Sequence, residues 1–280
     1  MYKVSFISYL CPFIFPEKQK IMITLSTFYT FLTVMAAVAV VVFVALFFVD
    51  AGYGKFINPK FGPTIPNRIG WFLMEFPVFL AMTILWVMSG DMFEVMPLIF
   101  FLIFQTHYFQ RSLIFPFIIR GNGRMPISIM LMGATFNTLN ALMQGGWIFW
   151  FGREVNPAMY SLDWLTSWQF IVGLIVFVAG FAINLHSDYI IRHLRKPGDT
   201  RHYIPRGGMF RFVSSANYFG EFMEWCGFAL LTWSPAGAVF ALWTFANLGP
   251  RANSIYHKYE NEFGEEFTKL RLKRIIPFVY

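Results

Sequence analysis

The sequence predicts an all-α, multi-pass integral membrane protein with seven transmembrane helices. The chain of 280 residues is 57% hydrophobic and 13% charged, whereas soluble domains are about 45–50% apolar and about 25% charged. The apolar residues gather in runs of about 20, the length that a helix needs to cross a bilayer. Aromatic residues make up 20% of the chain, which suits lipid-facing helices and interfacial belts.

The apolar runs place the helices in order along the chain. The first run, Phe28 to Val49, carries no charge and is the clearest. The seventh, Ala236 to Leu248, is short because Pro235 and Pro250 bound it. The five runs between them are Ile69 to Met88, Val95 to Ile119, Pro126 to Phe151, Trp164 to Ile191 and Phe212 to Trp233. The connections are too short for a separate soluble domain, so we expect one membrane-embedded domain over residues 1–280. Residues 1–60 form a generic helix and loop of this domain.

Basic residues concentrate in alternate connections, which predicts the orientation. Three connections and the C-terminal tail carry them: Lys55, Lys60, Arg68; Arg120, Arg124; Arg192, Arg195, Lys196, Arg201, Arg206, Arg211; and Arg251, Lys258, Lys269, Arg271, Lys273, Arg274. Basic loops stay on the cytoplasmic side, so the N-terminus is expected outside and the C-terminus in the cytoplasm. This orientation places Lys3, Lys18 and Lys20 on the outer side, against the same rule. The prediction follows the larger number of basic residues in the other connections.

The same loops explain the net charge of +7 without a nucleic-acid partner. Cys11 and Cys226 are the two cysteines, and they form neither a disulfide framework nor a metal-binding pattern. No metal is expected. No G-x-G-x-x-G follows a predicted strand, so the sequence gives no support for a Rossmann site.

Polar residues inside the predicted helices are functional candidates, because a charge at mid-membrane costs about 2.5–3.5 kcal/mol. In the fifth helix Asn184, Asp188 and Arg192 are spaced i, i+4, i+8, and Arg195 continues the same face. A local Asp188–Arg192 pair is the simpler alternative for this helix. The face runs from the membrane into the cytoplasm, where it could meet a charged ligand.

The sixth and third helices repeat this design. Asn217 and Glu221 are four residues apart on the sixth helix, with Glu224 on the adjoining face; hydrogen bonds between helices are the alternative explanation. The third helix offers Tyr108 and Arg111 at i, i+3. Here the alternative is an arginine that reaches the membrane surface beside an ordinary aromatic residue.

The second helix carries a single carboxyl, Glu75, among apolar neighbours. Such a group tends to be neutral, and a neutral acid can donate a hydrogen bond to a carbonyl. Carboxamide, carboxylate and arginine side chains together suit a ligand with amide, ribose and phosphate groups. We therefore predict that the four helices line one water-poor chamber, which a phosphate-bearing cofactor reaches from the cytoplasm.

Four segments carry a resemblance to a known family. They are Asn184 to Gly198 (NLHSDYIIRHLRKPG), Ile204 to Phe210 (IPRGGMF), Ser215 to Trp225 (SANYFGEFMEW) and Arg271 to Tyr280 (RLKRIIPFVY). From about residue 71 to residue 280 the chain resembles the steroid 5-alpha-reductases. The resemblance implies a seven-helix membrane bundle that reduces the 4,5 double bond of 3-oxo-4-ene steroids, or a related lipophilic enone, with NADPH. It implies the endoplasmic reticulum in a eukaryote or the inner membrane in a bacterium.

The resemblance also implies roles for single residues. Glu75 and Tyr108 would hydrogen-bond the steroid carbonyl while hydride reaches the beta carbon. The substrate, entering from the bilayer, would contact Trp71, Met74 and Trp225. NADPH would be held by Arg111, Asn184, Asp188, Arg195, Asn217, Glu221, Arg251 and Tyr259. The chain departs from the better-known members at Met74, where they carry Gln, and at Tyr203, where they carry Arg.

Two other functions remain as alternatives. A membrane methyltransferase acting on isoprenylcysteine shares a related C-terminal arrangement but uses S-adenosylmethionine, and the Asn-x-His-Ser-Asp segment argues against it. A transporter would need polar groups across the whole membrane and often shows inverted repeats. The fourth helix offers Asn137, Asn140 and Gln144, the first helix offers almost nothing, and no repeat is visible.

Overall fold

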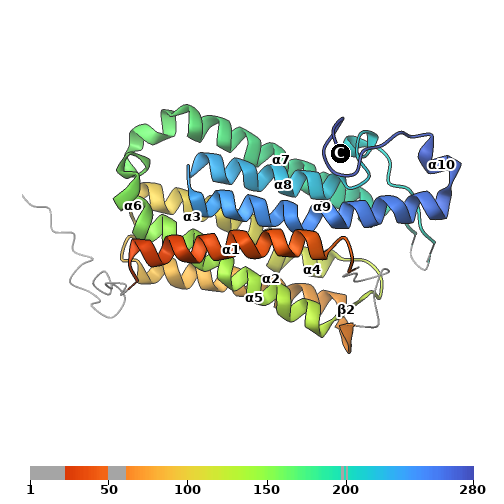
Figure 1. The fold of residues 1–280 in the computed structure, drawn as a ribbon, viewed down its shortest axis with the longest axis horizontal. Helices are drawn as coiled ribbons and strands as arrows, with labels where there is room; N and C mark the ends of the chain where they lie inside the picture. The colour runs from red at the N-terminus through yellow and green to blue at the C-terminus, as the bar shows by residue number, and fades with distance from the viewer. Residues whose placement is uncertain (1–22, 50–60, 197–198, 200) are drawn as a thin grey trace, which may run out of the picture.

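The computed structural model describes residues 23–49, 61–196, 199 and 201–280. In this part of the chain, long helices lie side by side in one bundle (Figure 1). Their bounds are α1 Leu25–Ala45, α2 Asn67–Met88, α3 Val95–Phe109, α5 Ile127–Gly146, α7 Trp168–His193, α8 Ala216–Leu231 and α9 Pro235–Phe263. The predicted all-α class is confirmed. The lysines at positions 3, 18, 20, 55 and 60, and Cys11, lie outside the described residues.

Short elements complete the bundle. Two of the long helices continue through a π-helical stretch into a further helical turn: α3 through η4 Gln110–Ile114 into α4 Phe115–Ile118, and α5 through η5 Trp147–Phe151 into α6 Gly152–Val155. The remaining elements are η6 Pro157–Tyr160, η7 Leu162–Thr166, η8 Gly208–Arg211, α10 Glu265–Thr268 and the antiparallel pair β1 Thr64–Pro66 with β2 Arg124–Pro126.

Among the described residues, α1, α2 and α7 are each long and apolar enough to cross a membrane by length and composition. The π-helical stretches divide the third and fourth predicted runs into shorter elements. The number of seven transmembrane spans and the orientation therefore remain predictions.

The last long helix ends later than the sequence predicted. Pro235 does begin α9, where the Ser234 hydroxyl accepts a hydrogen bond from the backbone N–H of Gly237. Pro250, however, does not end the helix, which continues to Phe263. A proline removes one backbone hydrogen bond and crowds the preceding turn, and packing on the neighbouring helices outweighs that cost here. The predicted boundary at Leu248 marked the end of the apolar residues and not the end of the helix.

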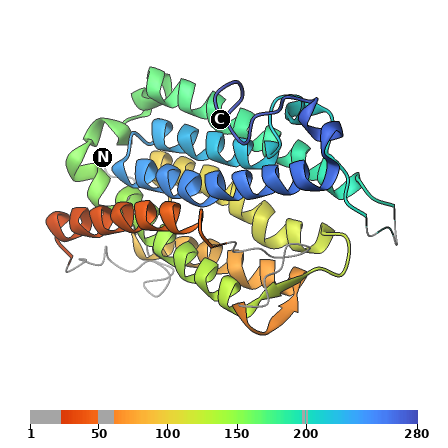
Figure 2. The same ribbon diagram turned by 45° about the vertical axis from the view of Figure 1, so that its right-hand side comes forward.

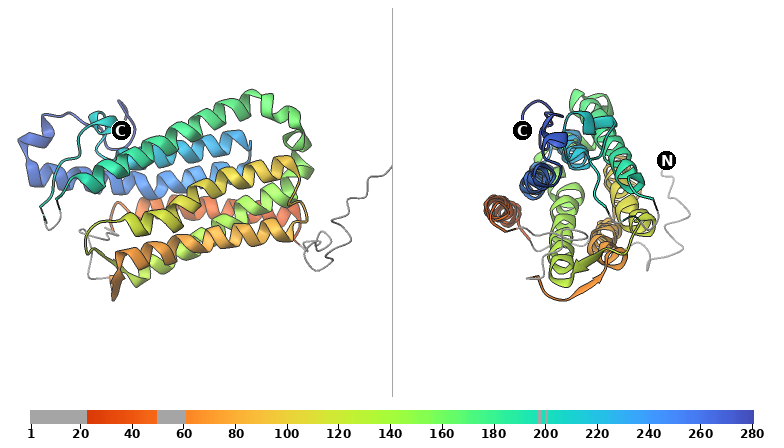
Figure 3. Two further views of the ribbon diagram at one scale, coloured as in Figure 1. Left: turned by 180° about the vertical axis from the view of Figure 1, so that it is seen from behind. Right: turned by 90° about the vertical axis from the view of Figure 1, so that its right-hand side faces the viewer.

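The bundle has two distinct ends. In Figures 1 and 3 the β1–β2 pair, α10 and the C-terminus lie at one end, and α6 lies at the other. We call these the C-terminal end and the α6 end. The C-terminal tail is tied down there, since the backbone N–H of Ser214 donates to Lys273 O over 2.8 Å and the backbone of Tyr280 bonds to that of Ile275 and Ile276.

Helices α7 and α8 touch backbone to backbone. Glycines recur at seven-residue spacing on both helices, Gly173 and Gly180 on α7 and Gly220 and Gly227 on α8. A Cβ atom at Gly180 would lie 2.3 Å from the backbone nitrogen of Glu224. Small residues permit this close approach between membrane helices. Figure 2 shows the two helices side by side. Their contact brings Asn184 of α7 within hydrogen-bond distance of the Asn217 backbone of α8.

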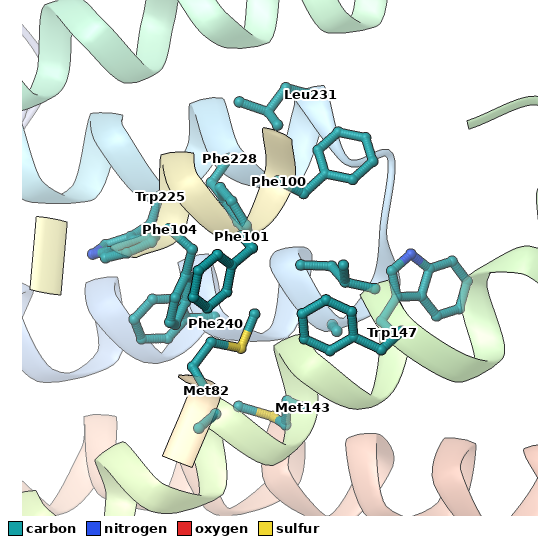
Figure 4. Close-up of a cluster of buried hydrophobic side chains, with 14 of the residues drawn as sticks. Met82, Phe100, Phe101, Phe104, Met143, Trp147, Trp225, Phe228, Leu231 and Phe240 are labelled. Carbon is teal, nitrogen blue, oxygen red and sulfur yellow. The ribbon is translucent and has the colours of Figure 1, made fainter. Parts of the chain in front are cut away.

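An apolar core fills the half of the bundle toward the α6 end. Figure 4 shows side chains of this core, and the labelled ones come from α2, α3, α5, η5, α8 and α9. Trp147, Trp225 and Phe228 are each at most 1% exposed. Trp225 and Tyr108 both belong to this core where it meets the polar half, and the Trp225 ring centroid lies 5.6 Å from that of Phe104 and 5.7 Å from that of Tyr108.

Candidate active site

Arg111 is the centre of a buried ion-pair cluster. It lies in the π-helical stretch η4, and π-helical turns inside α-helices are frequent at functional sites. Its Nη1 donates to Asp188 Oδ2 and its Nη2 to Glu221 Oε2, both over 2.9 Å. The guanidinium lies over the rings of Trp71 and Phe115, 5.1 and 4.6 Å from their centroids. Asp188 thus pairs across the bundle with Arg111, in place of the local pair with Arg192.

Asn184 joins α7 to α8 beside this cluster. Its Nδ2 donates to the backbone carbonyl of Asn217 over 3.0 Å and to Glu221 Oε2 over 3.4 Å. The side chain is fully buried, and its Oδ1 has no partner among the described residues. Two predicted cofactor residues, Arg111 and Asn184, therefore donate to the carboxylate of a third, Glu221, and the Asn184 Oδ1 acceptor remains available there.

A cavity of about 170 Å³ opens at the C-terminal end of the bundle. Three predicted cofactor residues line it: Arg195, Asn217 and Tyr259. Arg195 Nε is buried and has no partner among the described residues. Burial raises the pKa of Tyr259 to about 12, so its hydroxyl stays protonated at neutral pH. The cavity thus combines a cation with neutral hydrogen-bonding groups.

The segment after α7 forms one wall of this cavity through His202, Tyr203 and Pro205. His202 Nδ1 lies 2.6 Å from Glu262 Oε2, and Arg206 Nη2 lies 2.9 Å from Glu266 Oε1. The Tyr203 hydroxyl donates to Asp199 Oδ2 over 2.6 Å, and this bond raises the pKa of Tyr203. The wall is therefore held to the polar end of α9 and the turn after it.

Glu75 and Tyr108 lie in the same polar half of the bundle. Glu75 is 9% exposed and Tyr108 2%. The two side chains interact electrostatically with one another, and Glu75 also interacts with Arg111 and Glu221. The structure thus brings the predicted polar faces of the second, third, fifth and sixth helices to one buried region.

The three residues predicted to contact substrate lie around this region. Trp71 packs edge-on against Phe115 at 5.0 Å between ring centroids and beside Arg111. Met74 is buried against Gly133 of α5, and Trp225 stacks obliquely near Tyr108. The predicted cofactor residue Arg251 lies apart: its Nε donates to Asn247 Oδ1 one turn earlier on α9, and it does not line the cavity.

Two features of the site were given no role in the sequence-based prediction. His107 Nδ1 lies 2.9 Å from Glu224 Oε1 in a pair that is 3% and 0% exposed. The other feature is a polar face of α5, where Asn137 donates to Glu75 and Asn140 to Tyr108. Its signal was available in the sequence: Asn137, Asn140 and Gln144 are spaced i, i+3, i+7 in an otherwise apolar helix.

Fold and site together define a helical protein with a buried polar cluster around Arg111 and a cavity at the C-terminal end of the bundle. The family model for 3-oxo-5-alpha-steroid 4-dehydrogenase matches residues 123–280. The chain is 40% identical over 234 residues to 3-oxo-5-alpha-steroid 4-dehydrogenase 1 of Macaca fascicularis, covering 82% of this chain and 86% of the relative. It is 40% identical over 231 residues to the Homo sapiens protein of the same name, covering 81% and 86%. Identity to steroid 5-alpha-reductase DET2 of Gossypium hirsutum is 39% over 259 residues, covering 90% and 97%.

The chain therefore belongs to the 3-oxo-5-alpha-steroid 4-dehydrogenase family, and the resemblance noted in its motifs is confirmed. It is an oxidoreductase of the class that acts on CH–CH bonds. Its apolar helices and its family make it a membrane-embedded protein.

Proposed function

We propose that this protein reduces the 4,5 double bond of a 3-oxo-4-ene steroid, or of a related lipophilic enone, with NADPH. One observation carries the proposal: two buried hydrogen-bonding groups, Glu75 and Tyr108, lie in the same buried region as the Arg111 cluster. A buried carboxyl is costly to ionise, so Glu75 is proposed to be protonated and able to donate. The names of the relatives agree with this substrate class.

The proposed task of Glu75 and Tyr108 is to polarise the carbonyl of the enone. Reduction at the beta carbon moves negative charge onto the carbonyl oxygen. Donors placed where charge develops stabilise the transition state most in a dry site, and removal of one such donor costs about 2.7–4 kcal/mol. Trp71, Met74 and Trp225 are proposed to form the apolar walls that keep the steroid beside these donors and exclude water.

The residues at the C-terminal end fit a nicotinamide dinucleotide. Arg195 suits a phosphate, because an arginine fork matches phosphate oxygens, and its Nε has no partner among the described residues. Tyr259 and Asn217 line the same cavity, while Asn184, Asp188 and Glu221 offer acceptors for amide and hydroxyl groups deeper in the bundle. NADPH, when bound, supplies the hydride. Arg111 is proposed to hold the carboxylates of this region in place.

The two ligands are proposed to enter by different routes. The phosphate-bearing cofactor would enter through the cavity at the C-terminal end, which the positive-inside pattern assigns to the cytoplasm. The apolar substrate would enter from the bilayer. The membrane is that of the endoplasmic reticulum in a eukaryote or the inner membrane in a bacterium.

The test is a direct assay of the protein purified in detergent. With NADPH and a 3-oxo-4-ene steroid, the proposal expects loss of the enone absorbance, and no loss when NADPH is omitted. A thermal-shift measurement with S-adenosylmethionine is the matched control, because stabilisation by NADPH alone separates a reductase from a methyltransferase. An enone that stays intact with NADPH, across several 3-oxo-4-ene steroids, would contradict the proposal.

A further inference from the structure

Helix α5 carries a polar face that the proposed chemistry does not yet use. Asn137, Asn140 and Gln144 are 7%, 0% and 1% exposed, in a helix that carries no charged residue. Burying three carboxamides in a membrane protein is costly unless each is hydrogen-bonded. Each of them is, and two of the bonds lead to the two proposed donors, Glu75 and Tyr108.

The first chain of bonds has a defined direction. Gln144 donates through Nε2 to the backbone carbonyl of Ala236 over 3.0 Å, and a carbonyl can only accept. The same Nε2 donates to Asn140 Oδ1 over 3.2 Å, which leaves Asn140 Nδ2 to face Tyr108. Asn140 Nδ2 donates to the Tyr108 oxygen over 3.0 Å. The Tyr108 hydroxyl is therefore an acceptor toward α5, and its own proton is free to point at a substrate.

The second set of bonds is anchored in the same way. Asn137 Nδ2 donates to the backbone carbonyl of Met74 over 2.8 Å, which fixes which end of the amide faces α2. Its other hydrogen goes to Glu75 Oε2 over 3.0 Å. In a protonated carboxyl the carbonyl oxygen is the better acceptor, so in the neutral Glu75 proposed above this bond favours the proton on Oε1. Glu75 is thus oriented with one oxygen bound to α5 and the other available to donate.

We propose that Asn137, Asn140 and Gln144 are positioning residues that orient Glu75 and Tyr108 so that both donate to the substrate carbonyl. This inference rests on the proposed function. The backbone carbonyls of Met74 and Ala236 can only accept, so they fix which end of Asn137 and of Gln144 faces them. The direction of the remaining hydrogen bonds follows from this. Donors with a fixed direction do not need to reorganise as charge grows on the substrate oxygen. Such preorganised donors stabilise the transition state most strongly.

A double-mutant cycle tests the inference in the full-length protein. Asn140→Leu keeps the branched shape of the side chain but cannot donate. We expect it to lower kcat about tenfold, the range that one net hydrogen bond can supply, with KM for the steroid changed less than about threefold. In the Tyr108→Phe background the same substitution should change kcat by less than about twofold, because the group through which it acts is gone. Asn137→Leu should behave likewise in the Glu75→Gln background.

Controls separate positioning from damage to the fold. Thr138→Val alters an exposed hydroxyl of the same helix that bonds to Ala134 O over 2.9 Å, and it should leave kcat unchanged. If Asn140→Leu does not fold, Gln144→Met provides a second route. It frees the amide of Asn140 to rotate and should lower kcat several-fold at nearly constant KM.

The outcomes distinguish the two proposals. The positioning role would be overturned if Asn140→Leu left kcat unchanged. It would also be overturned if Asn140→Leu lowered kcat by the same factor in the Tyr108→Phe background as in the parent. Either result would leave the proposed function standing. A parent protein that leaves the enone intact would overturn both. If Tyr108→Phe and Glu75→Gln both reduce the enone at the parent rate, neither side chain acts as a donor. The positioning role would then be overturned together with the proposed role of the two donors.

Discussion

The close contact between α7 and α8 can be tested by adding one methyl group. In Gly180→Ala the new Cβ would lie 2.3 Å from the backbone nitrogen of Glu224 and 2.6 Å from the carbonyl oxygen of Gly220. Ordinary contacts begin at 3.4 Å, so the helices must separate by about 1 Å (3.4 minus 2.3). Both obstructing atoms belong to the backbone, and no rotation of a side chain can relieve the clash.

The expected magnitude follows from three effects. Overpacking of a well-packed contact costs about 1–3 kcal/mol. A 1 Å separation would also lengthen the 3.0 Å bond from Asn184 to Asn217 beyond hydrogen-bond range, which costs about 0.5–1.5 kcal/mol. Replacing glycine by alanine inside a helix stabilises the helix by up to about 1 kcal/mol, which offsets part of this loss. We expect a net loss of about 1–3 kcal/mol, or a fall in the unfolding midpoint of several degrees.

The assay is thermal unfolding in detergent, followed by tryptophan fluorescence, with Gly145→Ala as the matched control. A Cβ at Gly145 would meet the terminal Cδ1 atom of Leu85 at 2.7 Å, and Leu85 Cβ and Met82 Sδ at 3.3 Å. The closest of these atoms is the end of a flexible, partly buried side chain that can move aside, and the other two contacts need a shift of only about 0.1 Å to reach ordinary packing distance. The control should keep the parent midpoint within about 2 °C, in line with the small net change expected from helix propensity. The reasoning is refuted if Gly180→Ala is as stable as Gly145→Ala.

Three further predictions concern the buried polar cluster and the cavity at the C-terminal end. Arg111→Met leaves the carboxylates of Asp188 and Glu221 buried without their cation and should destabilise the protein by about 3–5 kcal/mol; an unchanged midpoint in the same thermal assay would contradict it. Adding Asp188→Asn and Glu221→Gln to this variant should recover part of the loss. Glu75→Gln should lower turnover about 100-fold or more with little change in NADPH affinity, measured by single-turnover kinetics and cofactor titration. Arg195→Ala should raise KM for NADPH at least about tenfold and leave KM for steroid within about twofold; equal changes in both would argue against a cofactor role.

The sequence predicted the helices because apolar runs and loop charges are local signals. It predicted the site only in part, since the partners of a buried charge depend on how helices rotate and pack. Arg111 illustrates this limit: its own helix offers no carboxylate, and its partners Asp188 and Glu221 come from two other helices. Pro250 illustrates another, because hydropathy marks where apolar residues stop and does not mark where a helix ends.

The division of the bundle into two halves bears on which class of function it can perform. A solute crossing the membrane would need a polar path from the C-terminal end to the α6 end. Beyond the buried polar cluster, such a path meets Trp225, Phe228 and Trp147, which are at most 1% exposed and packed in one aromatic core. Protein interiors of this kind are close-packed, so passage would require several large rings to move together. A buried polar cluster that adjoins a close-packed aromatic core suits a reaction that must exclude water, and this arrangement disfavours transport. The test is flux of a labelled solute through proteoliposomes without cofactor, which we expect to match protein-free vesicles.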